Sequence, residues 1–300
     1  MPSNLPPTEQ AGPVDNLHEM SVPELLEAMH RVDHDVQPAV ESAMPSLAGL
    51  IEPLVERMKQ GGRLFYLGAG TSGRLGVVDA SECPPTFGVS PGVVVGLMAG
   101  GDAAIRAAVE GAEDDEDQGW RDLEAHEIAP LDTVVGIAAS GRTPYVLGAL
   151  RQARLRGILT GCITCNPDSA VVHACDHPVV AVTGPEFVPG STRMKAGTAT
   201  KLTLNALTTI TMSRLGKTHR GRMVDVDTSA NAKLVDRGAR LVAEFGGVDR
   251  ERALELLREA GGRAKVAILM AARGLDAPAA ERALEAAGGI LDRTINPDKT

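Results

Sequence analysis

The sequence is poor in aromatic side chains, with one Trp, two Tyr and four Phe in 300 residues. Its core must therefore be built from Ala, Val, Leu, Ile and Met. It also lacks any run of about 18 apolar residues, the length that a membrane-spanning helix needs. The first residues contain prolines and Glu9, and they lack the basic and apolar blocks of a signal peptide. We therefore expect a cytoplasmic protein.

Positive charge is in deficit, because 30 Lys and Arg stand against 39 Asp and Glu and give a formal net charge of −9 at pH 7. This balance argues against nucleic acid or an anionic membrane as the main partner. A DNA-binding regulator would also need a helix-turn-helix head with a basic face, which the N-terminal segment does not offer. A small anionic ligand remains compatible, because a pocket responds to its local charge.

The sequence has four cysteines, too few for a disulfide framework. Cys162, Cys165 and Cys175 lie among His173 and His177, and this spacing alone resembles a zinc site. A buried strand with cysteine as a small core residue explains the same residues better. We therefore expect no metal.

Residues 1–59 are predicted to form an N-terminal arm followed by helices. Ser21 and Glu24 form a capping-box pattern that predicts a helix start. A second helical pattern runs from Val36 to Met58. Three prolines inside it are expected to kink it or break it into pieces. These prolines are Pro38, Pro45 and Pro53.

Between residues 60 and 224, short apolar runs alternate with helical patterns, and each run ends in a turn of small residues. The predicted strands are Arg63–Leu67, Val93–Met98, Thr133–Ala139, Gly161–Cys165 and His177–Val182. Near-continuous apolar strands that alternate with helices indicate a parallel sheet covered on both faces. We therefore predict a doubly wound α/β domain with a parallel five-stranded sheet over residues 60–224.

Beyond residue 225 the sequence shows no strand pattern. Four helical segments there are separated by Gly or Pro. They cover residues 231–245, 250–260, 263–272 and 278–287. The last three are short and rich in Ala, so we predict C-terminal helices with a small helical subdomain over residues 225–300.

Two loops at the ends of predicted strands have the composition of phosphate sites. Each offers glycine for close approach of the backbone, hydroxyl donors and the free amides of a following helix, a combination that suits phosphate. Ligands of open parallel sheets bind at this edge. The other interpretation is that both loops are merely tight turns between a strand and a helix. Because the same pattern occurs twice, this interpretation is less favoured. The residues expected to bind phosphate are Thr71, Ser72, Gly73, Ser140 and Thr143.

The first loop also matches the G-x-G-x-x-G pattern of dinucleotide-binding folds. Such a fold needs an acidic residue about 20 positions further on, yet no Asp or Glu stands between Glu82 and Asp102. Pro84 and Pro85 are expected to limit the first helix to about two turns. No phosphate-loop string G-x-x-x-x-G-K-[ST] occurs. A small phosphorylated metabolite therefore fits better than a nucleotide.

Two glutamates are candidate acid–base groups, because Glu often serves in that role. Glu82 lies in ASECPP, at the expected end of the first helix, where the dipole disfavours a carboxylate and so indicates a held position. Glu113 is expected to end the next helix, which Asp102 would cap. Glu110, one turn earlier, is an alternative to Glu113. Most acidic runs such as the one after Glu113 are solvated surface.

A basic segment joins the last strand to a long helix predicted over residues 192–215. Ser191 or Thr192 is expected to cap this helix. Arg193 and Lys195 oppose the helix dipole, which is unfavourable unless an anion lies there. This helix start is therefore a second candidate anion contact.

Several of these segments resemble the N-acetylmuramic acid 6-phosphate etherase family of the sugar isomerase (SIS) domain superfamily. The glucokinase regulatory protein is similar in the same segments, and the resemblance runs from about residue 20 onward. The strings that carry it are GAGTSGRLGVVDASECPPTFG, ASGRTPYVLGAL, GPEFVPGSTRMKAGTATK and SANAKLVDRGARL.

The resemblance implies a lyase of cell-wall sugar recycling that cleaves the D-lactyl ether of N-acetylmuramic acid 6-phosphate, with no cofactor. By resemblance, Glu82 protonates the departing lactate and then activates water, and Glu113 works at C2. The hydroxyl residues of both loops match sugar-phosphate-binding positions. The resemblance further implies that the chain forms a homodimer and that three residues at the start of the long helix complete the pocket. These residues are Thr192, Arg193 and Lys195.

Two other functions stay open. A sugar-phosphate isomerase or deaminase would share proton removal at C2, but it has no leaving group at C3 that needs an acid such as Glu82. A non-catalytic sugar-phosphate sensor related to the glucokinase regulatory protein would usually carry a second SIS domain, whereas this chain has strands for one sheet.

Overall fold

A computed structural model describes residues 5–226, 228 and 232–295. The chain divides into two compact units. The first unit comprises Met1–Ser81 and Gly92–Thr208, and the second comprises Glu82–Pro91 and Thr209–Thr300. No helix in the described ranges combines the length and the apolar character needed to cross a bilayer.

The first unit contains a five-stranded parallel sheet in the order β2-β1-β3-β4-β5. The five predicted strands are confirmed, each within two residues at either end. They are β1 (Leu64–Gly68), β2 (Val94–Met98), β3 (Thr133–Ile137), β4 (Leu159–Thr164) and β5 (His177–Val180). Every residue of β1, β3 and β4 is buried, as expected for a parallel sheet with both faces covered.

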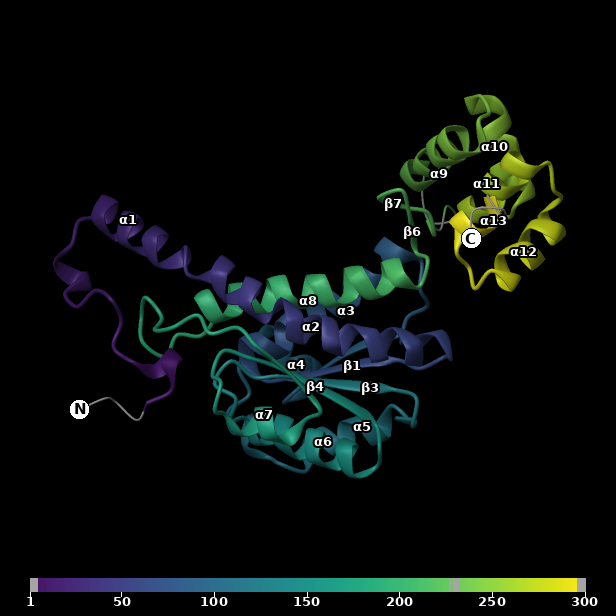
Figure 1. The fold of residues 1–300 in the computed structure, drawn as a ribbon. Helices are drawn as coiled ribbons and strands as arrows, with labels where there is room; N and C mark the ends of the chain where they lie inside the picture. The colour runs from purple at the N-terminus through teal and green to yellow at the C-terminus, as the bar shows by residue number, and fades with distance from the viewer. Residues whose placement is uncertain (1–4, 227, 229–231, 296–300) are drawn as a thin grey trace. The chain divides into compact units, whose positions relative to one another are not determined.

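Helices cover both faces of this sheet (Figure 1). On one face, α6 (Pro144–Leu155) packs so closely that a Cβ on Gly136 of β3 would lie 2.5 Å from the side chain of Val146. On the other face, a Cβ on Gly161 of β4 would lie 2.8 Å from the side chain of Leu50 in α2 (Val36–Lys59). The predicted doubly wound architecture is therefore confirmed. The covering helices include α2 (Val36–Lys59), α3 (Gly70–Phe87), α5 (Gln118–Ala125), α6 (Pro144–Leu155), α7 (Ala170–Ala174) and α8 (Lys195–Arg214).

The N-terminal helices begin as predicted but do not break as predicted. Helix α1 (Val22–Asp33) starts with a capping box, in which the Ser21 amide donates to the Glu24 carboxylate over 2.8 Å. Helix α2 is continuous through Pro45 and Pro53, so the prediction that prolines break it into pieces is wrong. Pro38 lies in its first turn, where amides have no acceptor within the helix. Burial of one face, including Leu50 and Leu54, offsets the hydrogen bonds that the inner prolines omit.

Helix α3 is also longer than predicted, because it runs for 18 residues through Pro84 and Pro85. Both prolines lie in its last turn. The Gly88 amide donates to the Pro84 carbonyl over 2.9 Å, and Gly88 has a φ of +62°. Glycine in this left-handed conformation is a common way to end a helix.

The second unit is mostly helical, and the predicted C-terminal helices are confirmed. Its helices are α9 (Ala232–Gly246), α10 (Arg250–Glu259), α11 (Ala264–Arg273), α12 (Ala277–Ala286) and α13 (Leu291–Ile295). Asn231, the expected first residue of the first of these helices, lies outside the described residues. The sequence missed α13 and a hairpin of β6 (Thr218–His219) and β7 (Arg222–Met223). Two-residue strands are too short to show an alternating pattern.

Candidate functional site

The first predicted phosphate loop lies where β1 and α3 meet, and their backbones touch there. A Cβ on Gly73 would lie 2.7 Å from the carbonyl oxygen of Gly68, the last residue of β1. Gly73 is buried, while the hydroxyl residues Thr71 and Ser72 are half-exposed. The first amides of a helix have no acceptor within it. This loop can therefore present hydroxyls and amides to an anion, with Gly73 allowing the close packing.

The second predicted phosphate loop, Ser140–Thr143, follows the neighbouring strand β3. Because the register pairs Gly68 of β1 with Ile137 of β3, both loops leave the same edge of the sheet. Ser140 and Thr143 are half-buried. Thr143 occupies the cap position of α6 without a side-chain hydrogen bond to that helix. The structure thus brings together the four predicted hydroxyl residues at one edge.

A pocket of about 220 Å³ opens beside the first loop. Its lining includes Gly70 and Arg74 from the start of α3, Met98 at the end of β2, and both Glu110 and Glu113. The rest of the lining is small and apolar, mostly alanine. Arg74 donates to the Ala104 and Ile105 carbonyls over 2.8 and 2.9 Å. It therefore holds the end of α4 (Gly101–Arg106) as a wall of the pocket.

Glu113 reaches this pocket from a different element than predicted. Helix α4 ends at Arg106, so Glu113 does not lie on it and Glu110 is not one helical turn earlier. Glu113 instead belongs to the short 3-10 helix η3 (Ala112–Asp114) and is exposed. The predicted Asp102 cap is also wrong, because Gly100, with a φ of +85°, occupies the cap position.

Glu82 lies in the last two turns of α3 and belongs to the second compact unit. Its side chain is exposed, whereas the neighbouring Cys83 is buried. The exposed carboxylate is therefore accessible to a ligand from solvent.

The basic helix start after β5 has an internal anion that sequence reasoning missed. The fully buried Glu186 carboxylate accepts the Lys195 amide over 2.9 Å and the Ala196 amide over 3.0 Å. The predicted Ser191 or Thr192 cap is therefore wrong, since Glu186 caps α8 from nine residues away. The Glu186 carboxylate already supplies negative charge at this helix start, so the helix dipole requires no external anion there.

The three predicted anion-binding residues of this segment differ in accessibility. Lys195 is 1% exposed, and its Nζ donates to the Asp35 carboxylate over 2.8 Å. Arg193 is exposed and Thr192 is half-exposed. Only Arg193 and Thr192 are therefore open to solvent.

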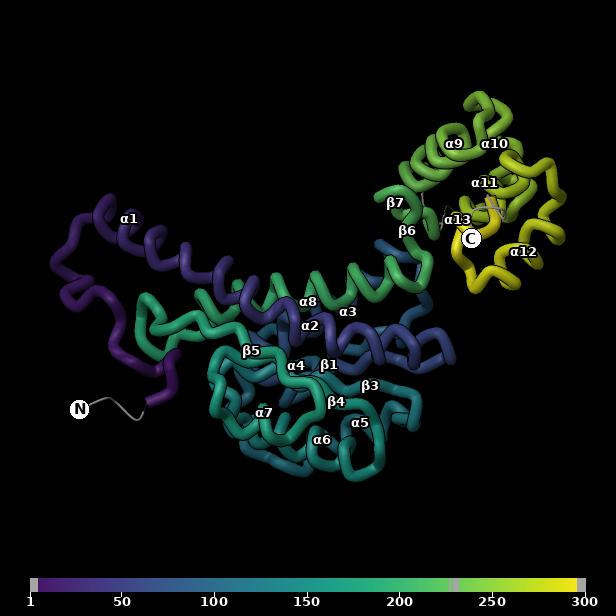
Figure 2. The backbone as a smooth tube through the Cα atoms, in the orientation of Figure 1, coloured from purple at the N-terminus to yellow at the C-terminus, as the bar shows by residue number. Residues whose placement is uncertain are grey.

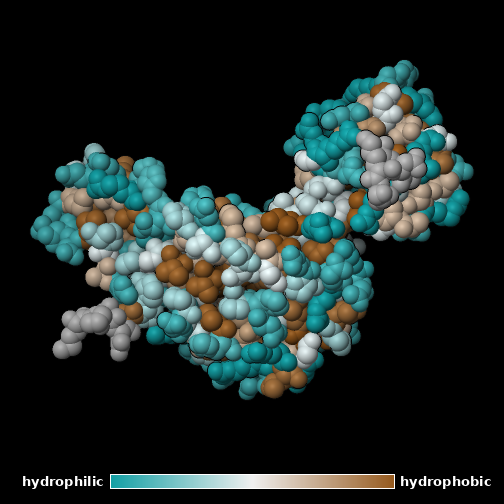
Figure 3. Space-filling view, viewed as in Figure 1, coloured by the Kyte–Doolittle hydropathy of each residue, from teal (hydrophilic) through white to brown (hydrophobic). Residues whose placement is uncertain are grey.

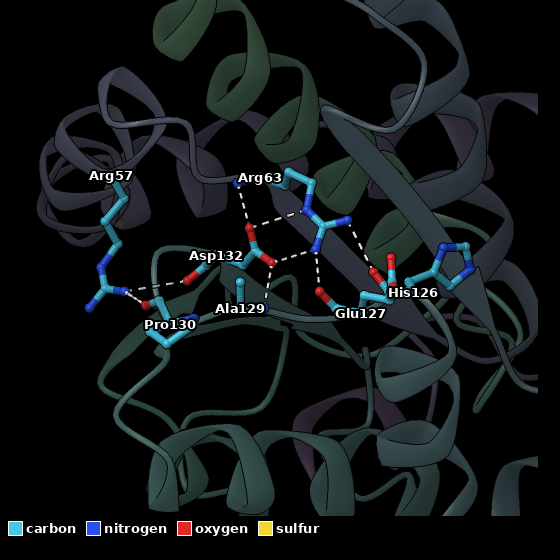
Figure 4. Close-up of polar contacts among 7 residues, drawn as sticks. All are labelled: Arg57, Arg63, His126, Glu127, Ala129, Pro130 and Asp132. Atoms are coloured by element: carbon cyan, nitrogen blue, oxygen red, sulfur yellow. Dashed lines mark hydrogen bonds and ion pairs between the residues drawn. The ribbon is translucent and has the colours of Figure 1, made fainter.

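A second polar cluster lies at the opposite, amino-terminal edge of the sheet (Figure 4). The Asp132 carboxylate accepts the Arg63 guanidinium over 2.8 Å, the Arg63 amide over 2.8 Å and the Ala129 amide over 2.8 Å. Arg57 donates to the Pro130 carbonyl over 2.6 Å. Since Asp132 is 2% exposed and both its oxygens are used, this cluster locks the strand starts and is not a ligand site.

The cysteines near β4 are core residues. Cys162 and Cys165 are at most 1% exposed, and all four cysteines are free. Burial raises the pKa of Cys165 to about 12, and a hydrogen bond with Cys175 and burial raise the pKa of Cys162. Within the described part of the chain, no group of three or more His, Cys, Asp or Glu residues is placed to hold a metal ion.

Two family models match the chain. The N-terminal SIS domain of the glucokinase regulatory protein matches residues 46–154, and the SIS domain matches residues 115–210. Among solved structures, a phosphoheptose isomerase from Francisella tularensis superimposes with a TM-score of 0.53 at 17% identity. That alignment covers 65% of this chain and 100% of the isomerase chain, and it shows the shared fold.

Curated relatives match over most of their length. The chain is 53% identical over 254 residues to an N-acetylmuramic acid 6-phosphate etherase of Christiangramia forsetii, covering 85% of this chain and 92% of the relative. It is 50% identical over 275 residues to the enzyme of the same name from Serratia proteamaculans, covering 92% of each chain.

Proposed function

The chain belongs to the N-acetylmuramic acid 6-phosphate etherase family, and on that premise we propose that it cleaves the D-lactyl ether of N-acetylmuramic acid 6-phosphate. The products are N-acetylglucosamine 6-phosphate and D-lactate, so the activity is that of a carbon–oxygen lyase. The observation that carries this proposal is the 53% identity to a curated etherase over 85% of the chain.

The proposed setting is cell-wall sugar recycling in the cytoplasm. A sugar 6-phosphate is charged, and charged groups enter the apolar part of a bilayer only at high energetic cost. The substrate would therefore stay in the compartment where it is made. The proposed sugar-phosphate-binding domain spans residues 60–224, between the N-terminal helices of residues 1–59 and the C-terminal helices of residues 225–300.

We propose that the two loops bind the 6-phosphate. Thr71, Ser72, Ser140 and Thr143 would donate hydroxyl or amide hydrogens, and Gly73 would let the backbone approach. Support comes from the position of these residues at one edge of the sheet. Thr192, Arg193 and Lys195 would complete the pocket, and Lys195 would do so by exchanging its Asp35 partner for the ligand.

The proposed reaction is an elimination followed by water addition. With the sugar ring open, the C1 aldehyde acidifies the C2 proton, which the Glu113 carboxylate removes. The electron pair forms the C2–C3 double bond and expels lactate from C3, as Glu82 protonates the departing oxygen. The Glu82 carboxylate then takes a proton from water, which adds to C3, and Glu113 returns a proton to C2. The two carboxyl groups must therefore start in opposite protonation states.

The first experiment incubates the purified protein with N-acetylmuramic acid 6-phosphate in H₂¹⁸O. We expect release of D-lactate and ¹⁸O at C3 of the sugar product, in addition to any exchanged at the C1 aldehyde, because the proposed route breaks the bond between C3 and the ether oxygen. Absence of lactate, with the sugar phosphate still bound, would overturn the etherase proposal and favour a sensor. Lactate that carries the ¹⁸O would contradict the elimination route.

Variants separate the two glutamates. Glu82→Gln and Glu113→Gln should each lower kcat about a thousandfold, since general acid–base groups contribute typically 10²–10⁴-fold. Glu110→Gln is the matched control, because Glu110 lines the same pocket, and it should stay within about threefold of the parent. Hydrogen exchange at C2 in D₂O assigns the roles. Glu82→Gln should still exchange this hydrogen, and Glu113→Gln should not.

We also propose that the chain forms a homodimer. Helix α1 exposes Val22, Leu26 and Met29, which are spaced along one helix face and are 69%, 64% and 36% exposed. Further apolar surface is exposed on the face of the first unit shown in Figure 3. Light scattering should give about twice the 31.3 kDa chain mass, and Leu26→Glu should lower it. A parent protein with the mass of one chain would contradict the proposal.

A further inference from the structure

A threonine of the N-terminal arm is buried inside the first unit. Thr8 lies in the 3-10 helix η1 (Pro7–Glu9) and is 0% exposed. Its carbonyl oxygen accepts the Gly190 amide over 3.1 Å. The arm thus lies beside the segment that joins β5 to α8, as Figure 2 shows. A polar side chain that is fully buried needs hydrogen-bond partners, and the partners of Thr8 identify its role.

The partner of Thr8 is the side chain of Asn166, just after β4. Asn166 Nδ2 donates to Thr8 Oγ1 over 3.0 Å and to the Ala139 carbonyl over 2.8 Å, while Asn166 Oδ1 accepts the Thr8 amide over 3.4 Å. A backbone amide can only donate. The Thr8 amide therefore selects the oxygen end of the Asn166 side chain, and Thr8 Oγ1, as the acceptor, holds the NH₂ end beside the Ala139 carbonyl.

Ala139 immediately precedes the second phosphate loop. Its carbonyl oxygen accepts the Asn166 side chain, the Cys165 amide over 3.2 Å and the Thr164 hydroxyl over 3.2 Å. The described residues contain no cis peptide bond, and in a trans peptide the C=O and the following N–H point in opposite directions. Fixing the Ala139 carbonyl therefore fixes the direction of the Ser140 N–H.

We propose that Thr8 is a positioning residue for the sugar-phosphate site. Thr8 orients the Asn166 amide, Asn166 holds the Ala139 carbonyl, and this carbonyl aims the Ser140 N–H at the phosphate. Thr8 itself does not touch the substrate. The inference rests on the proposed function in one respect, namely that the Ser140–Thr143 loop binds the 6-phosphate.

The test compares Thr8→Val with Thr8→Ser. Valine matches threonine in shape but removes the acceptor for Asn166 Nδ2, whereas serine keeps it. Thr8→Val should raise KM for N-acetylmuramic acid 6-phosphate about tenfold, the factor expected for one buried hydrogen bond. Its kcat should stay within about twofold, because the glutamates are untouched. Thr8→Ser should restore KM to within about threefold of the parent.

Gln10→Ala is the matched arm control, since its side chain donates to the exposed Leu5 carbonyl over 3.2 Å. It should leave both KM and kcat unchanged. An unchanged KM in Thr8→Val would overturn the inference, and so would a Thr8→Ser variant as impaired as Thr8→Val, because the role would then be steric. If Thr8→Val does not fold, Thr8→Ala against Thr8→Ser makes the same comparison.

Calorimetry with N-acetylglucosamine 6-phosphate separates this inference from the proposed function. A parent protein that binds this compound but releases no lactate would contradict the etherase activity alone. Thr8→Val should then still raise Kd about tenfold. An equal Kd for parent and variant would contradict the positioning role, whether or not lactate is released.

Discussion

The two phosphate loops share a composition, yet different contacts hold them in place. The first loop is fixed by backbone against backbone, because Gly68 and Gly73 touch where β1 meets α3. The second loop is held by both backbone and side-chain contacts of the β4–α7 connection and the start of α7: the Val171 amide donates to the Gly141 carbonyl over 3.1 Å, Asn166 holds the Ala139 carbonyl, and the Ser169 side chain packs against Gly141. A local motif therefore identifies both loops, while the support of the second loop comes from distant parts of the chain.

This difference has a consequence for tolerance to substitution. A contact between backbone atoms cannot be removed by a second substitution, so the activity lost with a larger residue at Gly73 should not be restored. A contact with a side chain can be removed, so the activity lost with a larger residue in the second loop should be restored by shortening the side chain that it meets. Three predictions test this contrast. Full recovery of activity after a substitution in the first loop, or no recovery in the second loop, would refute it.

The largest effect is expected for Gly73→Ala. A Cβ there would lie 2.7 Å from the Gly68 carbonyl oxygen and 2.7 Å from Met98 Cβ. The helix start must shift away from β1, and a displacement of about 1 Å at a binding group can lower activity about a hundredfold. Steady-state kinetics should show this loss in kcat/KM.

Gly70→Ala is the matched control in the same loop. Gly70 has a φ of +53°, but no atom lies within 4 Å of the position that an added Cβ would take. Only the strain of a left-handed residue remains, about 1–2 kcal/mol, and thermal unfolding should report it. If Gly70→Ala lowered kcat/KM as much as Gly73→Ala, the backbone conformation of this loop, and not its contact with β1, would explain the loss.

An intermediate effect is expected for Gly141→Ala in the second loop. A Cβ there would lie 2.0 Å from Ser169 Oγ and 2.2 Å from Ser169 Cβ. We expect kcat/KM to fall about tenfold, corresponding to about 1.4 kcal/mol. The double variant with Ser169→Gly should recover most of it, apart from strain at φ +69°. A double-mutant cycle measures the coupling, and additive losses would contradict the side-chain explanation.

The smallest effect concerns Asp79, which anchors the helix that starts at the first loop. It accepts Tyr66 of β1 over 3.1 Å and Asn205 of α8 over 2.9 Å. Burial raises the pKa of the Asp79 carboxyl, and hydrogen bonds from Asn205, Thr208 and Tyr66 oppose this in part.

The sign of the pH effect follows from this raised pKa. The folded state binds the Asp79 proton more tightly than the unfolded state, so the contribution of this group to stability falls as pH rises from about 4 through the raised pKa. In urea unfolding, the Asp79→Asn variant should lack this part of the pH dependence of the free energy of unfolding. We expect this part to amount to less than about 1 kcal/mol. A changed KM in Asp79→Asn would show that the first loop too depends on side-chain support.

The sheet was predictable because its strands are buried on both faces and read as apolar runs. Proline led to a wrong end for α3 and to a predicted break in α2 that does not occur, since a terminal glycine and burial outweighed its local effect. The Glu186 cap was missed because it acts across nine residues, outside any capping pattern. Glu113 kept its place as a candidate although its helix was wrong, because η3 brings it to the pocket by another route.

The buried Thr8 also affects how this fold can be taken apart. A fragment of residues 46–210 holds the whole sheet and both loops, yet it leaves Thr8 behind. Asn166 would then lose the two contacts that set its orientation. Grafting that fragment onto another protein would transfer the recognisable motif without the residue that aims it. The part of the chain that would have to be transferred is therefore larger than the motif, because Thr8 lies 132 residues before Ser140, the first residue of the loop that it positions.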